Sequence, residues 1–508
     1  MEQSYDKAAA EKIAMRPLQQ CLRHWALTKP VAVAVVDNGT AYSYRQVAIN
    51  TVQYIKMLEA AGLRKGMLVG IVSDYRYLHL LLLVACSAIG ATTISLTAFE
   101  LDADLELQRR CELFLLGSEV PETIAENLKG VIRLSQDLLD HALNTPVDDF
   151  SALNTVPGDN DIVQIARSSG TTGTSKFIPL TEPRHRARFR SYVWSFTDFS
   201  QISDLIIVFN LTMGAAAAMA FISLHYGKTM RFCTIQDLEQ NVAAADRSFV
   251  QLLPFYIAET VKSCGGRPWK KKAYEVRSIG GPVPDHLRSQ ILDLFASNVI
   301  SDYGSMETSA ISVTGGPEAG KLYPGVSVRI CSEAGDLLPP GRIGEIEVKS
   351  DQTIGGYLWD PELNRKHFRD GWFRLFDLGY GTEAGELIIV GRGDDVLNIG
   401  GFKVAPAHTE NQIKLLDGVN DAVLLGLPDA QGIEELHAYI ERNNPADDSA
   451  LQERILRTIY FGVREVTLHF VSKLPRTESG KVRRGELRDG LAAARAKLAM
   501  TEAKLASN

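Results

Sequence analysis

Hydrophobic and polar positions along the first two thirds of the chain alternate in blocks that predict strand–helix–strand units. Residues 67–72 and 91–96 are short apolar runs with β-branched residues, which is typical of buried strands. Residues 75–89 between them are long and apolar enough for a buried helix. The same alternation recurs over residues 205–295. It predicts an α/β fold whose largely parallel sheets are covered by helices on both faces.

The pattern changes near residue 320, and this change divides the chain. Glycine and proline turns then separate short β-type segments, which predict a small β-rich part over residues 320–393: 326–331, 345–350 and 386–390. After that, mixed strand and helix patterns return. We therefore expect an N-terminal domain over residues 1–393 and a small α+β C-terminal domain over residues 394–508.

Composition and charge narrow the class of protein. With 508 residues, 45% apolar and 23% charged, the chain is typical of a globular protein, and its net charge of −7 without a long basic run argues against a nucleic-acid partner. Six cysteines without metal-site spacing favour reduced thiols and a cytoplasmic location. Gly90 divides the uncharged run of residues 77–96, so we expect no membrane span. The basic residues 184–192 either lie near phosphate or, the interpretation we favour, form a solvated helix face.

The first candidate site is the polar loop within Gln164–Thr181, which reads QIARSSGTTGTSKFIPLT. Its glycines allow backbone N–H groups to approach anionic oxygens, and its hydroxyls and lysine add donors and charge. The alternative is a plain surface turn. The spacing differs from a Walker A loop, because two residues separate Gly173 from Lys176. The candidate phosphate-binding residues are Ser168, Ser169, Gly170, Thr171, Thr172, Gly173, Thr174 and Lys176.

A second candidate site is SDYGSME, residues 301–307. An aromatic ring beside a glycine can stack on adenine, and a carboxylate a few residues later can hold the Mg²⁺ that accompanies ATP. The alternative is a core tyrosine at a turn and an exposed glutamate. The candidate residues are Asp302, Tyr303, Gly304 and Glu307.

Five motifs in order over about residues 165–485 resemble the adenylate-forming superfamily of acyl-CoA synthetases, nonribosomal adenylation domains and beetle luciferases. SSGTTGTSK is similar to the family's SGTTGxxK, DYGSME to YGxTE and GWFRLFDLG to GWFRTGDLG. GRGDD matches the hinge motif, and LPRTESGKVRR is similar to PRTxSGKxxR. The resemblance implies that Asp377 accepts the ribose hydroxyls, that Arg392 contacts phosphate or ribose, and that Asp394 is the hinge of a mobile C-terminal domain. It also implies that Lys481 is catalytic and bridges the substrate carboxylate and the α-phosphate, where charge builds up in the transition state.

Three positions depart from the family's motifs. Met306 replaces a threonine whose hydroxyl bonds the α-phosphate in the family, a loss of about 0.5–1.5 kcal/mol. Leu375 and Phe376 replace the usual Thr-Gly, so we expect a different local backbone.

The resemblance implies an AMP-forming acid–thiol ligase. A carboxylic acid would attack the α-phosphorus of Mg-ATP to give an acyl-adenylate and pyrophosphate, and the thiol of coenzyme A would then displace AMP. One alternative acceptor is the phosphopantetheine arm of a separate carrier protein. An alternative of another class is a catalytically silent adenylate- or acyl-binding regulator, which the three departures motivate. Retention of Lys481, Glu307, Asp377 and Arg392 argues against it.

The resemblance also places the acid-binding pocket, at Asn210, Met213, Gly280, Gly281 and Met306. Amino-acid-activating relatives have an aspartate near the first of these, and FNLTMG here disfavours an α-amino acid. KFIPLT resembles the KLIPRT of stand-alone dihydroxybenzoate-adenylating enzymes, which use an asparagine at the Asn210 position near the ring hydroxyl. The alternative is that Asn210 caps or ends a strand. We prefer a small aromatic or short branched acid.

Overall fold

The computed structural model describes residues 15–169, 175–194, 199–281, 283, 285–315, 319–392, 397–399, 402–404, 406–428, 434–442, 449–459, 466–477 and 480–493. Five expected phosphate-loop residues and the expected hinge lie outside these ranges: Gly170, Thr171, Thr172, Gly173, Thr174 and Asp394. Ser168, Ser169 and Arg392 lie on described strands, and only their backbone is described.

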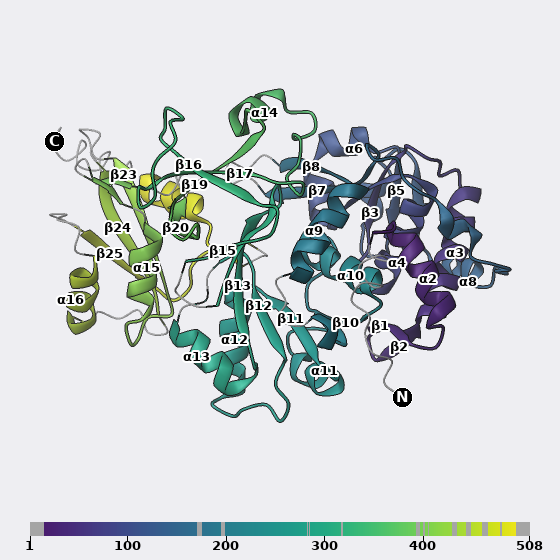
Figure 1. The fold of residues 1–508 in the computed structure, drawn as a ribbon, viewed down its shortest axis with the longest axis horizontal. Coiled ribbons are helices and arrows are strands. Elements are labelled where there is room, and N and C mark those ends of the chain that lie inside the picture. Colours follow the sequence, from purple (N-terminus) through teal and green to yellow (C-terminus); the bar gives the residue numbers. More distant parts are fainter. Residues whose placement is uncertain are drawn as a thin grey trace, which may run out of the picture.

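Within the part of the chain that the structure describes, six strands form the first sheet (Figure 1). Its order is β6 (Val131–Arg133), β5 (Leu113–Leu116), β3 (Leu68–Val72), β4 (Thr92–Ser95), β7 (Ile162–Ser169) and β8 (Ser175–Thr181). All neighbours are parallel except the hairpin β7–β8. The strands expected at 67–72 and 91–96 are thus confirmed, with α4 (Arg76–Ile89) between them.

Nine described strands form the second sheet. Its order is β15 (Lys321–Leu322), β14 (Ser309–Thr314), β13 (Val299–Ser305), β12 (Glu275–Ser278), β11 (Ser248–Leu252), β9 (Asp204–Ile207), β10 (Thr229–Phe232), β1 (Val33–Asp37) and β2 (Thr40–Ser43). The strands from β13 to β1 are parallel, and the antiparallel pairs lie at the two edges. The two sheets with their helices confirm the predicted α/β class.

Helices cover both faces of the second sheet, as the alternating side chains of β9 show. Leu205 and Ile207 belong to one hydrophobic core, and Ile206 belongs to another on the opposite face. The first core lies between the two sheets, where four helices bury their apolar faces: α2 (Leu18–Thr28), α3 (Tyr44–Ala60), α4 and α10 (Gly214–Tyr226). The second core includes α11 (Leu238–Ala244), α12 (Pro254–Cys264) and α13 (Asp285–Leu294).

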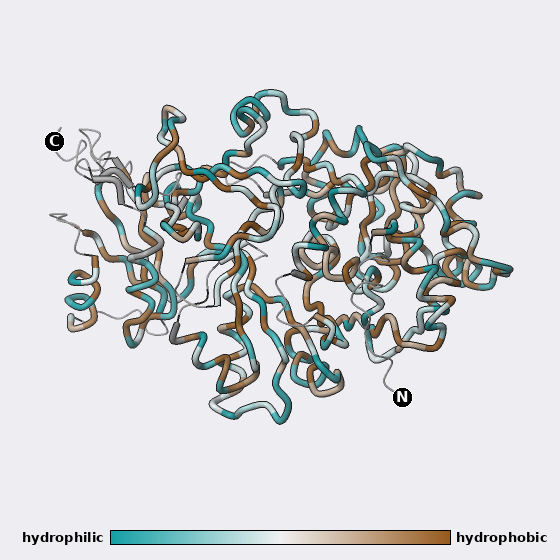
Figure 2. Tube along the Cα trace, in the orientation of Figure 1, coloured by the Kyte–Doolittle hydropathy of each residue, from teal (hydrophilic) through white to brown (hydrophobic). Residues whose placement is uncertain are grey.

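The described residues of this part form six further α-helices. They are α5 (Ala98–Ala103), α6 (Leu105–Arg110), α7 (Glu122–Ala125), α8 (Gln136–Leu143), α9 (Glu182–Trp194) and α14 (Pro361–His367). Figure 2 shows how hydropathy varies along the chain. The helix α14 at the edge is largely hydrophilic, whereas strands of the interior are largely hydrophobic. No helix among the described ranges is long and apolar enough to cross a membrane.

A third sheet forms the expected β-rich part and brings the site elements together. It contains β16 (Ser327–Cys331), β17 (Gly344–Lys349), β19 (Trp372–Gly381), β18 (Phe368–Arg369) and β20 (Leu387–Arg392). A third core joins its Val348 and Phe373 to Ile178 of β8 and Ile311 of β14. All three sheets therefore meet around this core.

The C-terminal part is built on a fourth sheet, which lies at the opposite end of the molecule from the first sheet (Figure 1). Its strands are β23 (Asp421–Pro428), β24 (Glu434–Glu441) and β25 (Val466–Val471), and it is packed with α15 (Pro406–Lys414) and α16 (Ser449–Thr458). A short hairpin, β21 (Leu397–Ile399) with β22 (Phe402–Val404), precedes it. Residues 484–493 are helical.

Candidate functional site

The strand β13 carries the Tyr-Gly pair of the second motif to the edge of the second sheet. Gly304 is required there, because a Cβ at this position would lie 2.1 Å from the carbonyl oxygen of Ser309 on β14. The pairing of β13 with β14 shifts register between Tyr303 and Gly304. This close approach directs the chain into the turn that presents Met306 and Glu307.

Tyr303 and Asp377 come together from two different sheets. The Tyr303 hydroxyl donates a hydrogen bond of 2.6 Å to Oδ2 of Asp377 on β19. Asp377 also pairs through its backbone with Arg392 of β20. The structure thus places side by side the ring expected to stack on adenine and the carboxylate expected to hold ribose.

Glu307 is buried, with 7% of its surface exposed, and not exposed as in the alternative interpretation. The hydroxyl of Tyr357 donates a hydrogen bond of 2.8 Å to its Oε1. Burial and the neighbouring carboxylate raise the pKa of Tyr357, so the phenol stays protonated and remains a donor. The ammonium of Lys176 lies 5.5 Å from the centre of the Tyr357 ring, within the range of a cation–π contact. Tyr357 therefore connects the lysine of the first motif to the carboxylate of the second.

Asp302 points into the protein. Its Oδ2 lies 3.3 Å from Nη1 of Arg277, and its Oδ1 accepts a hydrogen bond of 2.7 Å from the hydroxyl of Tyr323. Burial raises the pKa of Asp302 more strongly than the arginine lowers it. These contacts assign Asp302 a structural role beneath Tyr303.

The strands β7 and β8 flank the phosphate loop in antiparallel register. Ser168 pairs with Lys176, and Ser169 pairs with Ser175. The hairpin thus brings the two ends of the polar motif together, and Lys176 is half-buried at the start of β8.

The expected acid-binding residues lie at the ends of β9 and β12. Both polar side-chain atoms of Asn210 bond within the protein: Oδ1 accepts the N–H of Leu211 at 2.7 Å and Nδ2 donates to Asp74 Oδ1 at 3.1 Å. Asn210 thus shapes the turn after β9, as in the alternative interpretation. Gly280, with φ +75°, and Gly281 follow β12 and face the start of α12.

Met306 packs against the N-terminal end of α10. A Cβ at Gly214, the residue after Met213, would lie 2.4 Å from the terminal methyl of Met306. The absence of a side chain at Gly214 therefore leaves the space that the thioether fills. This contact brings the β13–β14 turn onto the helix that begins at Met213.

The prediction of a solvated face for residues 184–192 is wrong for Arg184 and Arg188. Arg188 is 8% exposed, and its guanidinium donates to the carbonyl of Met306 at 2.8 Å. Arg184 donates from Nε to the carbonyl of Thr353 at 3.0 Å. Charge alone misled the interpretation, because the carbonyl partners lie more than 100 residues away in sequence. Tyr357 was not predicted as a site residue for the same reason, because Glu307 and Lys176 are distant from it in sequence.

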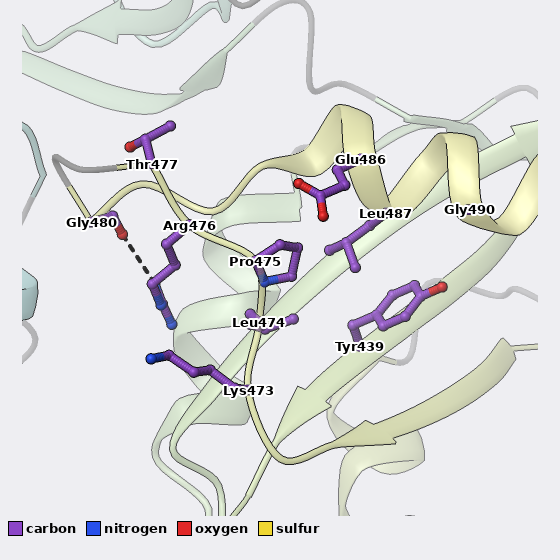
Figure 3. Close-up of a pocket in the computed structure, with 10 residues that line it drawn as sticks. All are labelled: Tyr439, Lys473, Leu474, Pro475, Arg476, Thr477, Gly480, Glu486, Leu487 and Gly490. Atoms are coloured by element: carbon purple, nitrogen blue, oxygen red, sulfur yellow. Dashed lines mark hydrogen bonds between the residues drawn. The ribbon is translucent and has the colours of Figure 1, made fainter. Parts of the chain in front are cut away.

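Lys481 lies in a loop of the C-terminal part, and the preceding residue, Gly480, lines the open pocket shown in Figure 3. The N–H of Thr477 donates to the carbonyl of Lys481 at 2.8 Å, and the N–H of Lys481 donates to Oγ1 of Thr477 at 3.2 Å. Arg476 bonds Asp421 at 2.5 Å and Arg484 forms a bidentate pair with Glu410 at 2.7 and 2.8 Å. Two arginines of the motif thus anchor the loop around the lysine.

The residues present fit a magnesium ion held jointly with a nucleotide. Mg²⁺ prefers oxygen ligands and is commonly bound by one or two carboxylates together with phosphate oxygens and water. Glu307 supplies one such carboxylate, with Tyr357 bonded to only one of its oxygens in the contacts described above. No group of three acidic, histidine or cysteine side chains able to hold a metal occurs among the described residues. Phosphate oxygens of the nucleotide and water would supply the other ligands.

The nucleotide-binding features agree with the comparison with known families. The sequence model for AMP-binding enzymes matches residues 22–358. The chain therefore belongs to the family of AMP-binding enzymes, which confirms the expected superfamily.

Individual relatives align with this protein over nearly the whole chain. The feruloyl-CoA synthase of Amycolatopsis sp is 28% identical over 494 residues, covering 91% of this chain and 96% of the relative. The 2-succinylbenzoate–CoA ligase of Bacillus licheniformis is 27% identical, covering 92% and 98%. These relatives confirm the expected enzyme class, an AMP-forming acyl- or aryl-CoA synthetase.

The fold is also similar to that of a protein whose structure has been solved. The o-succinylbenzoate coenzyme A synthetase MenE from Bacillus subtilis, in complex with ATP and magnesium ion, superposes with a TM-score of 0.81 at 21% identity. The match covers 93% of this chain and 99% of MenE. It confirms the predicted fold class.

Proposed function

We propose that the protein activates a carboxylic acid with Mg-ATP and transfers the acyl group to coenzyme A. The acid's oxygen attacks the α-phosphorus, the bond to the leaving pyrophosphate breaks, and an acyl-adenylate forms. The thiol of coenzyme A then attacks the acyl carbon, and the bond to AMP breaks. One observation supports this proposal most strongly: the chain aligns with nearly the whole length of relatives that are named as a CoA synthase and a CoA ligase.

The described site supplies groups for the first step. Lys176 and the backbone of residues 168–174 would hold phosphate, and Glu307 would hold the magnesium ion that neutralises phosphate charge. The ring of Tyr303 would stack on adenine, and Asp377 with Arg392 would bind ribose and phosphate. Their positions at the junction of three sheets support this assignment.

The second step needs a rearrangement in our proposal. The N-terminal domain, 1–393, carries the nucleotide site, and the C-terminal domain, 394–508, carries Lys481. A rotation about Asp394 would bring Lys481 to the α-phosphate for adenylation and then remove it so that the thiol can enter. The firm anchoring of the lysine loop to the fourth sheet supports movement of that domain as a unit.

The proposed acid is aromatic or a short acyl acid. Feruloyl-CoA synthase and 2-succinylbenzoate–CoA ligase, by their names, take aromatic acids. In this chain the segment after β9 contains Phe209, which is packed edge-on against Tyr256 at 5.4 Å between ring centres. The ring of an aromatic acid would pack favourably against such side chains.

The decisive experiment measures pyrophosphate release from Mg-ATP with a panel of aryl, short-chain, long-chain and amino acids, with and without coenzyme A. We expect release with one aryl or short acid, and AMP together with an acyl-CoA when coenzyme A is present. Release without any thioester would favour a carrier protein as acceptor. If no acid drives release, and Met306→Thr does not restore it, the silent adenylate-binding regulator replaces the ligase.

A further inference from the structure

Arg188 of α9 is bound to the backbone beside Glu307. Its Nη2 donates to the carbonyls of Met306 at 2.8 Å and Glu307 at 3.2 Å, and its Nε donates to the carbonyl of Gln352 at 3.3 Å. The side chain crosses from the helix that follows β8 to the turn that follows β13. One buried cation thus joins the element after the phosphate hairpin to the turn that carries the candidate metal ligand.

Three neighbouring contacts add to this connection between α9, the 350–354 segment and the turn at Glu307. The carbonyl of Glu307 also accepts the N–H of Ile354 at 2.9 Å. Gln352 donates from Nε2 to Oγ of Ser191, one turn along α9 from Arg188, at 2.5 Å. Arg184, one turn before Arg188, holds the carbonyl of Thr353. Of the four arginines of α9, only Arg188 has described bonds to the turn at Glu307.

The contacts require the shape of arginine. Its planar guanidinium presents donors in a fixed fork, which reaches adjacent carbonyls on one segment and a third carbonyl on another. A lysine at this position keeps the charge but offers a single compact donor group. Replacement by lysine would therefore preserve charge while releasing part of the fixed geometry.

We propose that Arg188 is a positioning residue for the metal–nucleotide half of the reaction. It fixes the backbone of Met306 and Glu307 while the phenol of Tyr357 fixes the Glu307 carboxylate from the side. Together these bonds hold the carboxylate beside Tyr357, whose ring centre lies 5.5 Å from the ammonium of Lys176 on the phosphate hairpin. This inference rests on the proposed function, since it gives Glu307 the role of magnesium ligand.

The test compares Arg188→Lys with Arg184→Lys in the full-length protein. The second variant is the matched control, because it perturbs the same helix and the same 350–354 segment without touching the turn at Glu307. Calorimetry would measure ATP affinity in Mg²⁺ and in EDTA, and thermal unfolding would report stability. We expect Arg188→Lys to weaken ATP binding in Mg²⁺ about tenfold, the loss of one charge-assisted hydrogen bond, with little change in EDTA. Arg184→Lys should leave both affinities unchanged.

A second variant keeps the proposal falsifiable if Arg188→Lys does not fold. Tyr357→Phe removes only the bond to the Glu307 carboxylate and should give the same magnesium-selective loss. Equal losses in Mg²⁺ and EDTA for Arg188→Lys, or the same loss in Arg184→Lys, would overturn the proposal. Binding is measured without an acid, so an inactive wild type would count against the proposed ligase and leave this test intact.

Discussion

The hydroxyl of Tyr303 donates a 2.6 Å hydrogen bond to the carboxylate of Asp377, 74 residues further along the chain. The bond joins β13 of the second sheet to β19 of the third. A short bond from a hydroxyl to a carboxylate is among the stronger hydrogen bonds in proteins. The proposed nucleoside site therefore lies between two sheets, and its geometry depends on both.

Removing this bond should affect nucleotide binding in two graded steps. Tyr303→Phe retains the ring for stacking but leaves Asp377 less firmly oriented, and we expect ATP affinity to fall about threefold to tenfold. Asp377→Asn removes the charged acceptor for ribose and should cost about tenfold or more. Calorimetric titration with ATP and Mg²⁺ measures both. Wild-type ATP affinity in Asp377→Asn would show that the carboxylate does not bind ribose.

Phe376 adopts a left-handed backbone conformation, with φ +62°. This conformation disfavours residues that carry a Cβ, and it explains why the related motif has glycine at this position. The ring is held by contacts with His367, at 5.0 Å, and with the guanidinium of Arg374, at 4.8 Å. Phe376 thus occupies a conformation that suits glycine, and the expected difference from the family's local backbone stays a prediction.

Two substitutions separate the strain from the ring contacts. Phe376→Ala and Phe376→Gly lose the same ring, but only alanine keeps the strained Cβ. We expect the glycine variant to be more stable than the alanine variant by about 0.5–1 kcal/mol, since strain of roughly 1–2 kcal/mol is offset partly by the greater chain entropy of unfolded glycine. Urea unfolding measures the difference. A more stable alanine variant would contradict the left-handed conformation.

Local sequence patterns predicted helices and strands well, but they did not predict contacts between residues that are distant in sequence. The helix α4, expected at residues 75–89, spans Arg76–Ile89, because Gly90 follows its end in a left-handed conformation. Arg188 could not be placed in this way, since its partner Met306 is 118 residues away. A basic helix face has the same sequence pattern whether water or carbonyl groups surround it.

The sequence motifs named candidate site residues without the contacts that support them. Lys176 was proposed from its polar loop and Glu307 from its position after Tyr-Gly, whereas their shared neighbour Tyr357 stands in no motif. Asn210 differs from Tyr357, because the sequence singled it out but left its role open. A short polar residue after a strand can stabilise a turn or contact a ligand. The structure shows two bonds of Asn210 in the turn, and its contact with the acid stays a prediction.

The loop around Lys481 offers a graded test of the proposed catalytic lysine. Thr477→Val removes the hydroxyl that accepts the N–H of Lys481, so the loop should lose definition and adenylation should slow about twofold to tenfold. Lys481→Ala removes the transition-state donor and should slow adenylation by about 100-fold or more. Acid-dependent pyrophosphate release measures both. Thioester formation from a supplied acyl-adenylate is the control, and an equal loss there would indicate general damage.

Glu182, at the start of α9, should make stability depend on pH. It lines a small buried cavity with His185 and His225, and its Oε1 lies 3.9 Å from Nη1 of Arg186, too far for a hydrogen bond. Burial raises the pKa of Glu182 from 4.5 to about 7, and Arg186 only partly opposes this effect. Between these values the folded protein binds a proton that the unfolded chain releases. The free energy of unfolding should therefore fall as the pH rises from 4.5 to about 7.

Glu182→Gln isolates this contribution, because glutamine keeps the size of the side chain and does not titrate. Relative to this variant, the wild type should lose about 3 kcal/mol of stability between pH 4.5 and pH 8. Burial lowers the pKa of His185 to about 3 and of His225 to about 4, which acts in the opposite direction but equally in both proteins. Urea unfolding of both proteins across this range measures the difference. A constant difference would mean that Glu182 is ionised in the folded protein, with Arg186 compensating its charge.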